Sequence, residues 1–197
     1  MVSSYLFLVA AVVLQRLLEV RISRLNEAGL RARGASEHAP EQMPVMIAVH
    51  AAWLASCLLE VWLLHRPLTR WLALFALLLF CVGQALRLLA IRELGERWTV
   101  KIITLPGASP VTGGIFRYLR HPNYVGVVLE ILALPLIHGA WLTALVFSVA
   151  NGVLLSRRIA AEEHALSESG DYEAQFQGRP RMVPRLFDAG SESEKPV

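Results

Sequence analysis

The sequence has little charge and almost no cysteine. Only 18% of its 197 residues are Asp, Glu, Lys or Arg, whereas 55% are hydrophobic, and the charges fall between long apolar runs. This composition excludes an ordinary soluble domain and is typical of a polytopic membrane protein, for which no nucleic-acid partner is expected. Cys57 and Cys81 both lie in apolar runs, where they behave as small apolar residues and form no disulfide framework.

The glycine-rich fingerprints of soluble nucleotide-binding domains are also missing. Gly113 and Gly114 follow a loop instead of a strand, so a Rossmann-type domain is not supported. No spacing of His, Cys, Asp or Glu is typical of a metal site. His50 and Glu60 lie in or at the edge of an apolar run, and we expect each to contact a polar neighbour and not a metal ion.

Five apolar runs are present, and each is interpreted as a membrane span. They cover residues 4–20, 45–64, 71–91, 124–137 and 141–156. The first run lacks a basic leader and is followed by arginines, which favours a retained span over a cleaved signal peptide. The sequence therefore predicts an all-α, polytopic integral membrane protein with about five transmembrane helices.

The first run ends in polar residues. Gln15, Arg16 and Glu19 lie near its end, where we expect their long side chains to snorkel to the membrane surface. Residues 23–44 are polar and contain Gly and Pro, and they are interpreted as a solvated connector.

Basic residues are distributed unevenly between the loops. Four arginines lie within residues 21–33 and five basic residues within residues 92–120, against only Arg66 and Arg70 between the second and third runs. By the positive-inside rule, the N-terminus lies outside and the C-terminus in the cytoplasm, which an odd number of spans satisfies. The richness in Ala, Leu and Arg favours a bacterial inner membrane.

The stretch before the fourth run joins polar residues to a helix start. Pro122 prefers the first turn of a helix and biases His121 towards an extended conformation, which fixes Arg120 and His121 at the helix mouth. Tyr124 adds a flat face and a hydroxyl at the same level. Gly126 lets a ligand or a second backbone come close.

Glu130 lies within the fourth run. A carboxylate in hydrocarbon is costly unless it is paired or neutral, so Glu130 is by default a functional residue. A neutral carboxyl bonded to Ser148 or Asn151 of the fifth run is an equally good interpretation.

The fourth and fifth runs are joined by residues 138–140, which is too short for anything except a tight helical hairpin. From His121 to Gly139 is 18 residues, and 18 more reach Arg157, or about 27 Å in each direction at about 1.5 Å per residue. Steps of 4, 3 and 4 residues place on one face of the fifth helix Asn151, Leu155, Arg158 and Glu162. If that face meets the fourth helix, one pocket at the membrane surface gathers Arg120, His121, Tyr124, Arg158 and Glu162.

Two sequence elements carry a family resemblance. Residues 120–126 read Arg-His-Pro-Asn-Tyr-Val-Gly and resemble the Arg-His-Pro-x-Tyr-x-Gly motif of the isoprenylcysteine carboxyl methyltransferase family, integral membrane enzymes that use S-adenosylmethionine. A second family element, Arg-x-x-x-Glu-Glu, stands here at residues 158–163. The resemblance covers roughly residues 94–184.

Two further segments are similar to the family, although each has an alternative. Residues 94–101 resemble the Leu-Gly-x-x-Trp/Phe-Thr segment of bacterial members, and a Trp-anchored interfacial segment is the other interpretation. The spacing of Tyr172, Arg181 and Pro184, with Phe176 at an aromatic position, looks like the family's C-terminal lid segment. An amphipathic surface tail is the alternative.

The resemblance implies S-adenosylmethionine as cofactor, bound in a cytoplasmic pocket, and no metal. It implies a catalytic role for Arg158, Tyr124 and Glu130. It implies a cofactor-binding role for Arg120, His121, Pro122, Tyr124, Gly126, Glu162 and Glu163. The chain then divides into three N-terminal helices (1–91), a cofactor-binding and catalytic region (92–187) with the hairpin 122–156 and a cytoplasmic C-terminal segment, and a disordered tail (188–197).

The methyl acceptor stays open at this point. The founding activity of the family is methyl esterification of the carboxylate of a prenylated cysteine, and a lipidic polyketide hydroxyl or a thiol are other lipophilic acceptors. Two further hypotheses are an NADPH-dependent membrane reductase of the sterol reductase kind and a non-enzymatic membrane scaffold. Binding of S-adenosylmethionine, of NADPH, or of neither would discriminate among the three.

Overall fold

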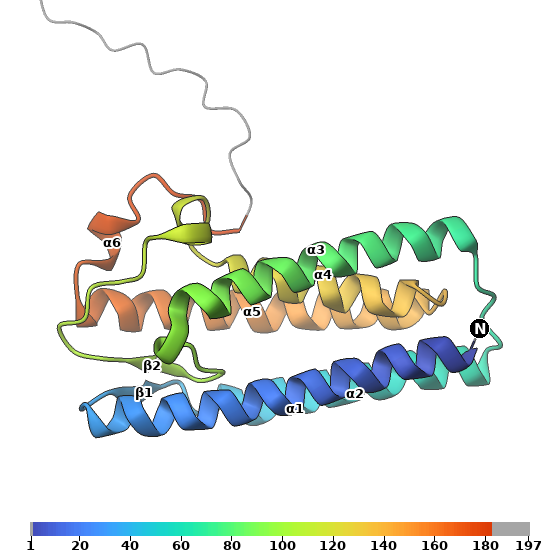
Figure 1. Cartoon of the computed structure of the whole chain (residues 1–197), viewed down its shortest axis with the longest axis horizontal. Coiled ribbons are helices and arrows are strands. Elements are labelled where there is room, and N and C mark those ends of the chain that lie inside the picture. Colours follow the sequence, from blue (N-terminus) through green and yellow to red (C-terminus); the bar gives the residue numbers. More distant parts are fainter. Residues whose placement is uncertain (1, 183–197) are drawn as a thin grey trace, which may run out of the picture.

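The computed structural model describes residues 2–182, so the predicted disordered tail and Pro184 lie outside the described residues. Its five long helices run roughly along one common axis (Figure 1). They are α1 (Val2–Ala32), α2 (Gln42–Leu63), α3 (Arg70–Leu94), α4 (Pro122–Leu136) and α5 (Trp141–Ser169). The shorter elements are β1 (Ser36–His38), η1 (Gly95–Arg97), β2 (Ile102–Thr104), η2 (Gly114–Arg117) and α6 (Tyr172–Gln175).

The helices have the apolar outer surface of a membrane protein. Three of them, α2, α3 and α5, are long and apolar enough to cross a bilayer, and α4 is a shorter apolar helix. Large apolar side chains point outward, such as Trp71 (82% exposed) and Phe7 (75% exposed). Such a surface is stable only against lipid, which agrees with the predicted polytopic, all-α membrane fold.

The predicted solvated connector at residues 23–44 is wrong in part. Helix α1 continues to Ala32, because good helix formers follow the first apolar run and Glu27 pairs with Arg31 one turn later. After Gly34, which has a φ of +85°, β1 pairs antiparallel with β2, with Glu37 opposite Ile103. A polar helical extension and a two-stranded ribbon thus stand where a loop was expected.

Helices α3 and α4 pack most closely at two glycines. A Cβ at Gly126 would lie 2.7 Å from the Gly83 carbonyl oxygen and 2.5 Å from Cγ of Arg87, so neither atom leaves space for a side chain there. Of the two interpretations of Gly126, close approach of a second backbone is therefore the one observed.

The hairpin between α4 and α5 forms as predicted. Gly139 adopts a φ of +72° in the turn, a conformation that glycine reaches without steric cost. The carboxylate of Glu60 accepts hydrogen bonds from the backbone N–H groups of Leu142 (3.2 Å) and Thr143 (2.6 Å), which begin α5. Glu60 also pairs with Arg66 at 2.9 Å, so it contacts polar neighbours as expected.

His50, which also lies in α2, contacts a polar neighbour as expected. Nδ1 of His50 lies 2.8 Å from the Met46 carbonyl oxygen. No cluster of three or more His, Cys, Asp or Glu side chains that could hold a metal ion occurs within residues 2–182.

The two ends of the bundle differ. The N-terminus, the α2–α3 connection and the α4–α5 turn lie at one end, and β1, β2 and α6 gather at the other (Figure 1). Tyr5 near the start of α1 donates a hydrogen bond to the Leu134 carbonyl at 3.1 Å, which joins α1 to α4 at the first end. The predicted site residues His121, Tyr124, Arg158 and Glu162 lie towards the second end, and Glu130 lies deeper in the bundle.

Candidate cofactor and acceptor site

The centre of the site is the hydroxyl of Tyr124. It accepts a hydrogen bond from Nε of Arg158 at 2.9 Å and donates one to the carboxylate of Glu162. Tyr124 and Arg158 are buried, whereas 30% of the Glu162 side chain remains exposed. The geometry of the hairpin thus brings these residues together as the sequence predicted.

His121 lies beside this group. It has φ −127° and ψ 58°, outside the helical region as expected for the residue before Pro122, and its ring stacks on Tyr124 with centroids 5.4 Å apart. Its Nε2 lies 3.1 Å from the Glu163 carboxylate, and its Nδ1 lies 3.9 Å from Glu162. One imidazole therefore faces both acids of the second sequence element.

Glu163 ties the site to the C-terminal segment, residues 170–182. Its carboxylate accepts two hydrogen bonds from Arg181, at 3.1 and 2.6 Å, in addition to the contact with His121. The hydrogen bonding between Arg181 and Glu163 raises the pKa of Arg181 above its usual value. Since Glu163 is buried and its oxygens already have protein partners, Glu162 is the acid with free capacity for a ligand.

The backbone of the first sequence element holds the same segment. The N–H of Arg120 donates to the Pro180 carbonyl and that of His121 to the Arg181 carbonyl, each at 3.0 Å. Nε of Arg120 donates to the Arg179 carbonyl at 2.8 Å, and its Nη1 lies 3.7 Å from Glu173. The C-terminal segment therefore closes over the site in this structure, with Arg120 as its main fixing point.

A cleft opens beneath this segment. Its empty space of about 920 Å³ includes the part that is open to solvent. One part is polar and is lined by Arg97, Thr99, Lys101, Arg120, His121 and Glu162. Another part is apolar and aromatic and is lined by Leu94, Val111, Phe116, Leu166, Tyr172 and Phe176.

The segment that leads into β2 forms part of the site, although only the family resemblance pointed to it. Nη2 of Arg158 donates to the Val100 carbonyl at 2.5 Å, and the Val100 N–H donates to Oγ of Ser23 at 2.9 Å. Nζ of Lys101 binds Glu27 at 2.9 Å and Glu37 at 3.1 Å. The bond to Lys101 lowers the pKa of Glu27, and the same bond raises the pKa of Lys101.

The extension of α1 thus supports the site from below. Neither Ser23 nor Glu27 was a candidate in the sequence, because a residue that supports a neighbouring loop has no periodicity or motif of its own.

An apolar groove lies on the other side of Tyr124. Its walls come from α4, α5 and the C-terminal segment, and it is lined by Val128, Gly152, Leu155, Ser156, Ile159, Ala160, Arg181 and Met182. The ring of Tyr124 packs with Leu155 and Ile159, while its hydroxyl bonds to Glu162 in the polar cleft. Tyr124 therefore contacts residues that line the polar cleft and residues that line the apolar groove.

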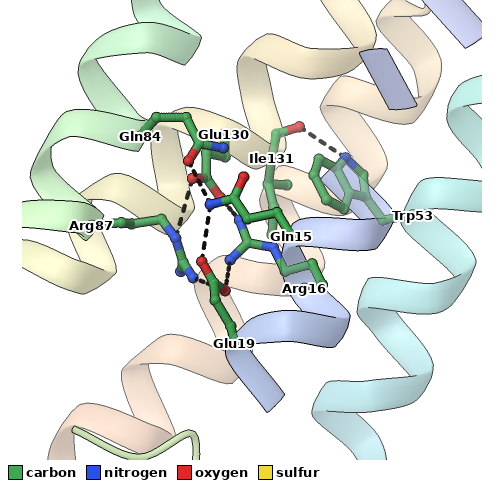
Figure 2. Close-up of polar contacts among 8 residues, drawn as sticks. All are labelled: Gln15, Arg16, Glu19, Trp53, Gln84, Arg87, Glu130 and Ile131. Carbon is green, nitrogen blue, oxygen red and sulfur yellow. Dashed lines mark hydrogen bonds and ion pairs between the residues drawn. The ribbon is translucent and has the colours of Figure 1, made fainter. Parts of the chain in front are cut away.

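Glu130 lies deeper in α4 and belongs to a different group. Figure 2 shows its carboxylate between two arginines, with an ion pair to Arg16 and one to Arg87 at 3.2 Å. Glu19 pairs with the same two arginines, at 2.6 Å to Arg87. We call this group the charge cluster, and its members are Gln15, Arg16, Glu19, Gln84, Arg87 and Glu130.

The charge cluster corrects two expectations. Arg16 and Glu19 do not snorkel to the surface, because facing charges on α3 and α4 hold them inside the bundle. Glu130 contacts arginines and not Ser148 or Asn151. With two arginines and two carboxylates, the cluster joins α1, α3 and α4 without net charge.

The structure thus gathers most of the predicted site residues at one end of the bundle. Pro122 starts α4 and is fully buried, Gly126 is used in helix packing, and Glu130 is in the charge cluster. The residues that lie together are Arg120, His121, Tyr124, Arg158, Glu162 and Glu163.

Comparison with known proteins agrees with the family resemblance of the two sequence elements. Residues 75–168 match the model of the isoprenylcysteine carboxyl methyltransferase (ICMT) family. The uncharacterised protein YpbQ of Bacillus subtilis is 38% identical over 162 residues, which are 82% of this chain and 95% of YpbQ. The protein-S-isoprenylcysteine O-methyltransferase of Schizosaccharomyces pombe is 32% identical over 115 residues, which are 56% of this chain and 49% of that enzyme.

A solved structure is also similar in fold. The eukaryotic intramembrane Ras methyltransferase ICMT superposes with a TM-score of 0.53 at 22% identity, over 73% of this chain and 53% of that chain. This chain therefore spans about half the length of the relatives that are named as methyltransferases.

Proposed function

This chain belongs to the isoprenylcysteine carboxyl methyltransferase family, and we propose that it transfers a methyl group from S-adenosylmethionine to a lipophilic acceptor at the membrane surface. Tyr124 carries this proposal, because its ring packs on Leu155 and Ile159, which line an apolar groove, while its hydroxyl bonds to Glu162, which lines a polar cleft. A polar cofactor and a lipid-like acceptor need such an arrangement, since one binds in a polar cleft and the other in an apolar groove. The methyl group of the cofactor and the accepting atom must nevertheless come into contact.

The chemistry of the cleft fits S-adenosylmethionine. The cofactor has a carboxylate, an amino group and a ribose diol, for which a protein needs both cations and a carboxylate. Glu162, with its partly exposed carboxylate, is suited to the ribose hydroxyls or the amino group. Arg120 and His121 supply positive or donor groups at the same wall, and the apolar part suits a purine.

Arg158 is the residue that we propose to hold the acceptor. Its Nε donates a hydrogen bond to the Tyr124 hydroxyl and its Nη2 donates one to the Val100 carbonyl, so the guanidinium is fixed in place. Its Nη1 is left to bind an acceptor carboxylate. When bound, S-adenosylmethionine supplies an electrophilic methyl group, and a carboxylate acceptor needs no general base. The task of the protein is therefore to hold the acceptor oxygen in line and to exclude water.

The roles of the other site residues follow from their contacts. We propose that Tyr124 keeps Arg158 and Glu162 in fixed orientation, that His121 orients Glu162, and that Arg120 and Glu163 hold the C-terminal segment closed. Glu130 acts at a distance, by fixing α4 against α1 and α3.

The acceptor is proposed as a lipophilic molecule with a carboxylate, and a prenylated cysteine is the model compound. A lipidic polyketide hydroxyl or a thiol are the other acceptor classes. The apolar groove supports a lipid tail as part of the acceptor, because most of its lining comes from the apolar helices α4 and α5. The division of the chain into N-terminal helices (1–91) and a catalytic region (92–187) is kept as part of this proposal.

We also propose that the site faces the cytoplasm, with the N-terminus outside, in a bacterial inner membrane. The basic residues of α1's extension, of residues 92–120 and of residues after Arg157 belong to the end of the bundle where the site lies, and Arg66 and Arg70 belong to the other. The positive-inside rule favours the cytoplasm for the more basic end, where S-adenosylmethionine is made.

Calorimetric binding of S-adenosylhomocysteine to the purified wild type and to Glu162→Ala tests the proposal. Micromolar binding to the wild type and its loss in the variant are expected. Glu168→Ala is the matched control, since Glu168 lies on the same helix, is exposed and pairs with the exposed His164. A folded wild type that binds NADPH instead would favour the reductase, and one that binds neither would favour the scaffold.

A further inference from the structure

The hydroxyl of Tyr172 is a buried polar group without a partner. Only 3% of Tyr172 is exposed, and its Oη makes no hydrogen bond to any other part of residues 2–182. Buried hydroxyls nearly always have a partner, so an unsatisfied one at a cleft points to a ligand. Tyr172 lines the same cleft as Arg120, His121 and Glu162.

The position of Tyr172 is fixed by its neighbours. Its ring packs on Phe176 with centroids 4.8 Å apart, and Arg179 lies over Phe176 at 5.0 Å. Arg179 also donates hydrogen bonds to the carbonyls of Thr112 (3.3 Å) and Phe116 (2.9 Å). The hydroxyl is therefore held in place without a bond of its own, and this arrangement suits a residue preorganised for a ligand.

The surroundings define the ligand group that this hydroxyl would meet. Tyr172 belongs to an apolar cluster with Ala90, Phe116 and Phe176, which Leu94 and Val111 extend. Burial raises the pKa of the Tyr172 phenol, and Glu163 and Glu162 raise it further, so the group stays a hydrogen-bond donor. The ring therefore lies in an apolar cluster, and the hydroxyl lies on the side of the charged residues of the cleft. An apolar face with one donor at its edge is complementary to an aromatic heterocycle that has an unprotonated ring nitrogen.

We propose that Tyr172 binds the adenine of the cofactor by donating a hydrogen bond to one of its ring nitrogens. The adenine then lies in the apolar part of the cleft, between η2 and α6, and the amino acid end lies towards Arg120, His121 and Glu162. This assignment rests on the proposed function. It adds a specificity residue, because a base without an acceptor nitrogen at that position would leave the phenol unpaired again.

The first test is Tyr172→Phe, which removes one oxygen and keeps the ring. Because this oxygen has no partner in the free protein, the variant is expected to unfold at the same or a slightly higher temperature than the wild type. Its affinity for S-adenosylhomocysteine is expected to fall about fivefold to tenfold by calorimetry, the effect of one neutral hydrogen bond. Tyr118→Phe is the matched control, since Tyr118 is 66% exposed and does not line the cleft.

The second test identifies the ring atom. S-adenosylhomocysteine analogues with a carbon in place of N1, N3 or N7 are titrated into the wild type and Tyr172→Phe. One analogue is expected to bind the wild type more weakly than S-adenosylhomocysteine does, by the same factor by which Tyr172→Phe weakens the binding of S-adenosylhomocysteine. The wild type and Tyr172→Phe are then expected to have equal affinity for this analogue.

Three results are possible besides the expected one. If all three analogues keep the full difference between the two proteins, the hydroxyl binds another part of the cofactor and the purine assignment is overturned. Equal affinity of wild type and Tyr172→Phe for S-adenosylhomocysteine overturns the role of Tyr172 altogether. A wild type that binds no S-adenosylhomocysteine refutes the proposed function itself, and this inference with it.

Discussion

Nε of Arg158 donates a hydrogen bond to the hydroxyl of Tyr124 at 2.9 Å. The two residues come from antiparallel helices, 34 positions apart in the chain. The short turn at Gly139 joins these helices, so residues of α4 and α5 that lie at similar distances from the turn come within reach of each other's side chains. One short connection therefore places the guanidinium of one sequence element on the aromatic side chain of the other.

Tyr124→Phe is expected to lower turnover and, because it also releases Glu162, to weaken cofactor binding. The ring still fills its place against Leu155 and Ile159, but Arg158 loses an acceptor and Glu162 loses a donor. Hydrogen bonds to charged groups contribute about 1.5–3 kcal/mol each, so kcat should fall about 10-fold to 150-fold. Steady-state kinetics beside the exposed-site control Tyr118→Phe measures this, and a wild-type kcat would refute the orienting role of Tyr124.

The convergence of Tyr124, Arg158 and Glu162 could be predicted because it depends only on local geometry. A fixed rise per residue and a three-residue turn determine which residues of a hairpin lie level. The partners of Glu130 could not be predicted in this way. Arg16 and Arg87 belong to helices far away in the chain, and the sequence does not specify which faces of α1, α3 and α4 meet.

The backbone pairing that docks the C-terminal segment could not be predicted from the residue types either. Two of its bonds to the first sequence element run from the backbone N–H groups of Arg120 and His121 to backbone carbonyls. Every residue except proline has such groups, so the sequence alone carries no trace of this pairing. The helical extension of α1 was missed for another reason, since its polar composition is equally typical of a loop.

Arg181→Ala is expected to speed the release of the cofactor. Arg181 joins the C-terminal segment to Glu163, and without it the segment keeps its backbone bonds, its contacts with Arg120 and the packing of Tyr172 and Phe176. Because 65% of the Arg181 side chain is exposed, the thermal unfolding temperature should hardly change. Stopped-flow measurement should show S-adenosylhomocysteine dissociating about fivefold faster, in line with one weakened partly exposed bond.

The control for this variant is Arg117→Ala, because Arg117 is exposed and lies in η2 near the same cleft. An unchanged dissociation rate in Arg181→Ala would mean that the C-terminal segment does not limit cofactor release.

Gly152→Leu is expected to weaken the binding of long-tailed acceptors. Gly152 lines the apolar groove, and a Cβ added there meets nothing within 4 Å, so the new side chain extends into the groove without disturbing the core. Displacing two methylenes of a tail costs about 1.6 kcal/mol, which should raise the KM of a farnesylated cysteine more than tenfold. Cofactor affinity should be unchanged.

Gly29→Leu is the matched control for the groove variant. Gly29 lies on an exposed face of α1, where an added Cβ also meets nothing within 4 Å. If Gly152→Leu and Gly29→Leu have the same KM for long and short tails, the acceptor does not use this groove.

Glu130→Gln separates a structural role from a catalytic one. The charge cluster balances Arg16 and Arg87 against Glu19 and Glu130, so neutralising Glu130 leaves one buried positive charge uncompensated. Breaking a buried pair in this way costs about 3–5 kcal/mol, and thermal unfolding in detergent should detect it. The fraction that remains folded should still bind S-adenosylhomocysteine, because Glu130 makes no contact with Tyr124, Arg158 or Glu162.

The double variant Arg87→Met with Glu130→Leu provides the decisive comparison. It removes one charge of each sign, and Arg16 and Glu19 remain as a balanced pair. The methionine stem can also keep the packing that Arg87 now makes against Gly126. Replacing a buried ion pair by apolar residues of similar volume is often neutral, so the double variant should be more stable than Glu130→Gln. The opposite pattern, wild-type stability of Glu130→Gln with loss of turnover, would instead establish Glu130 as a catalytic carboxylate.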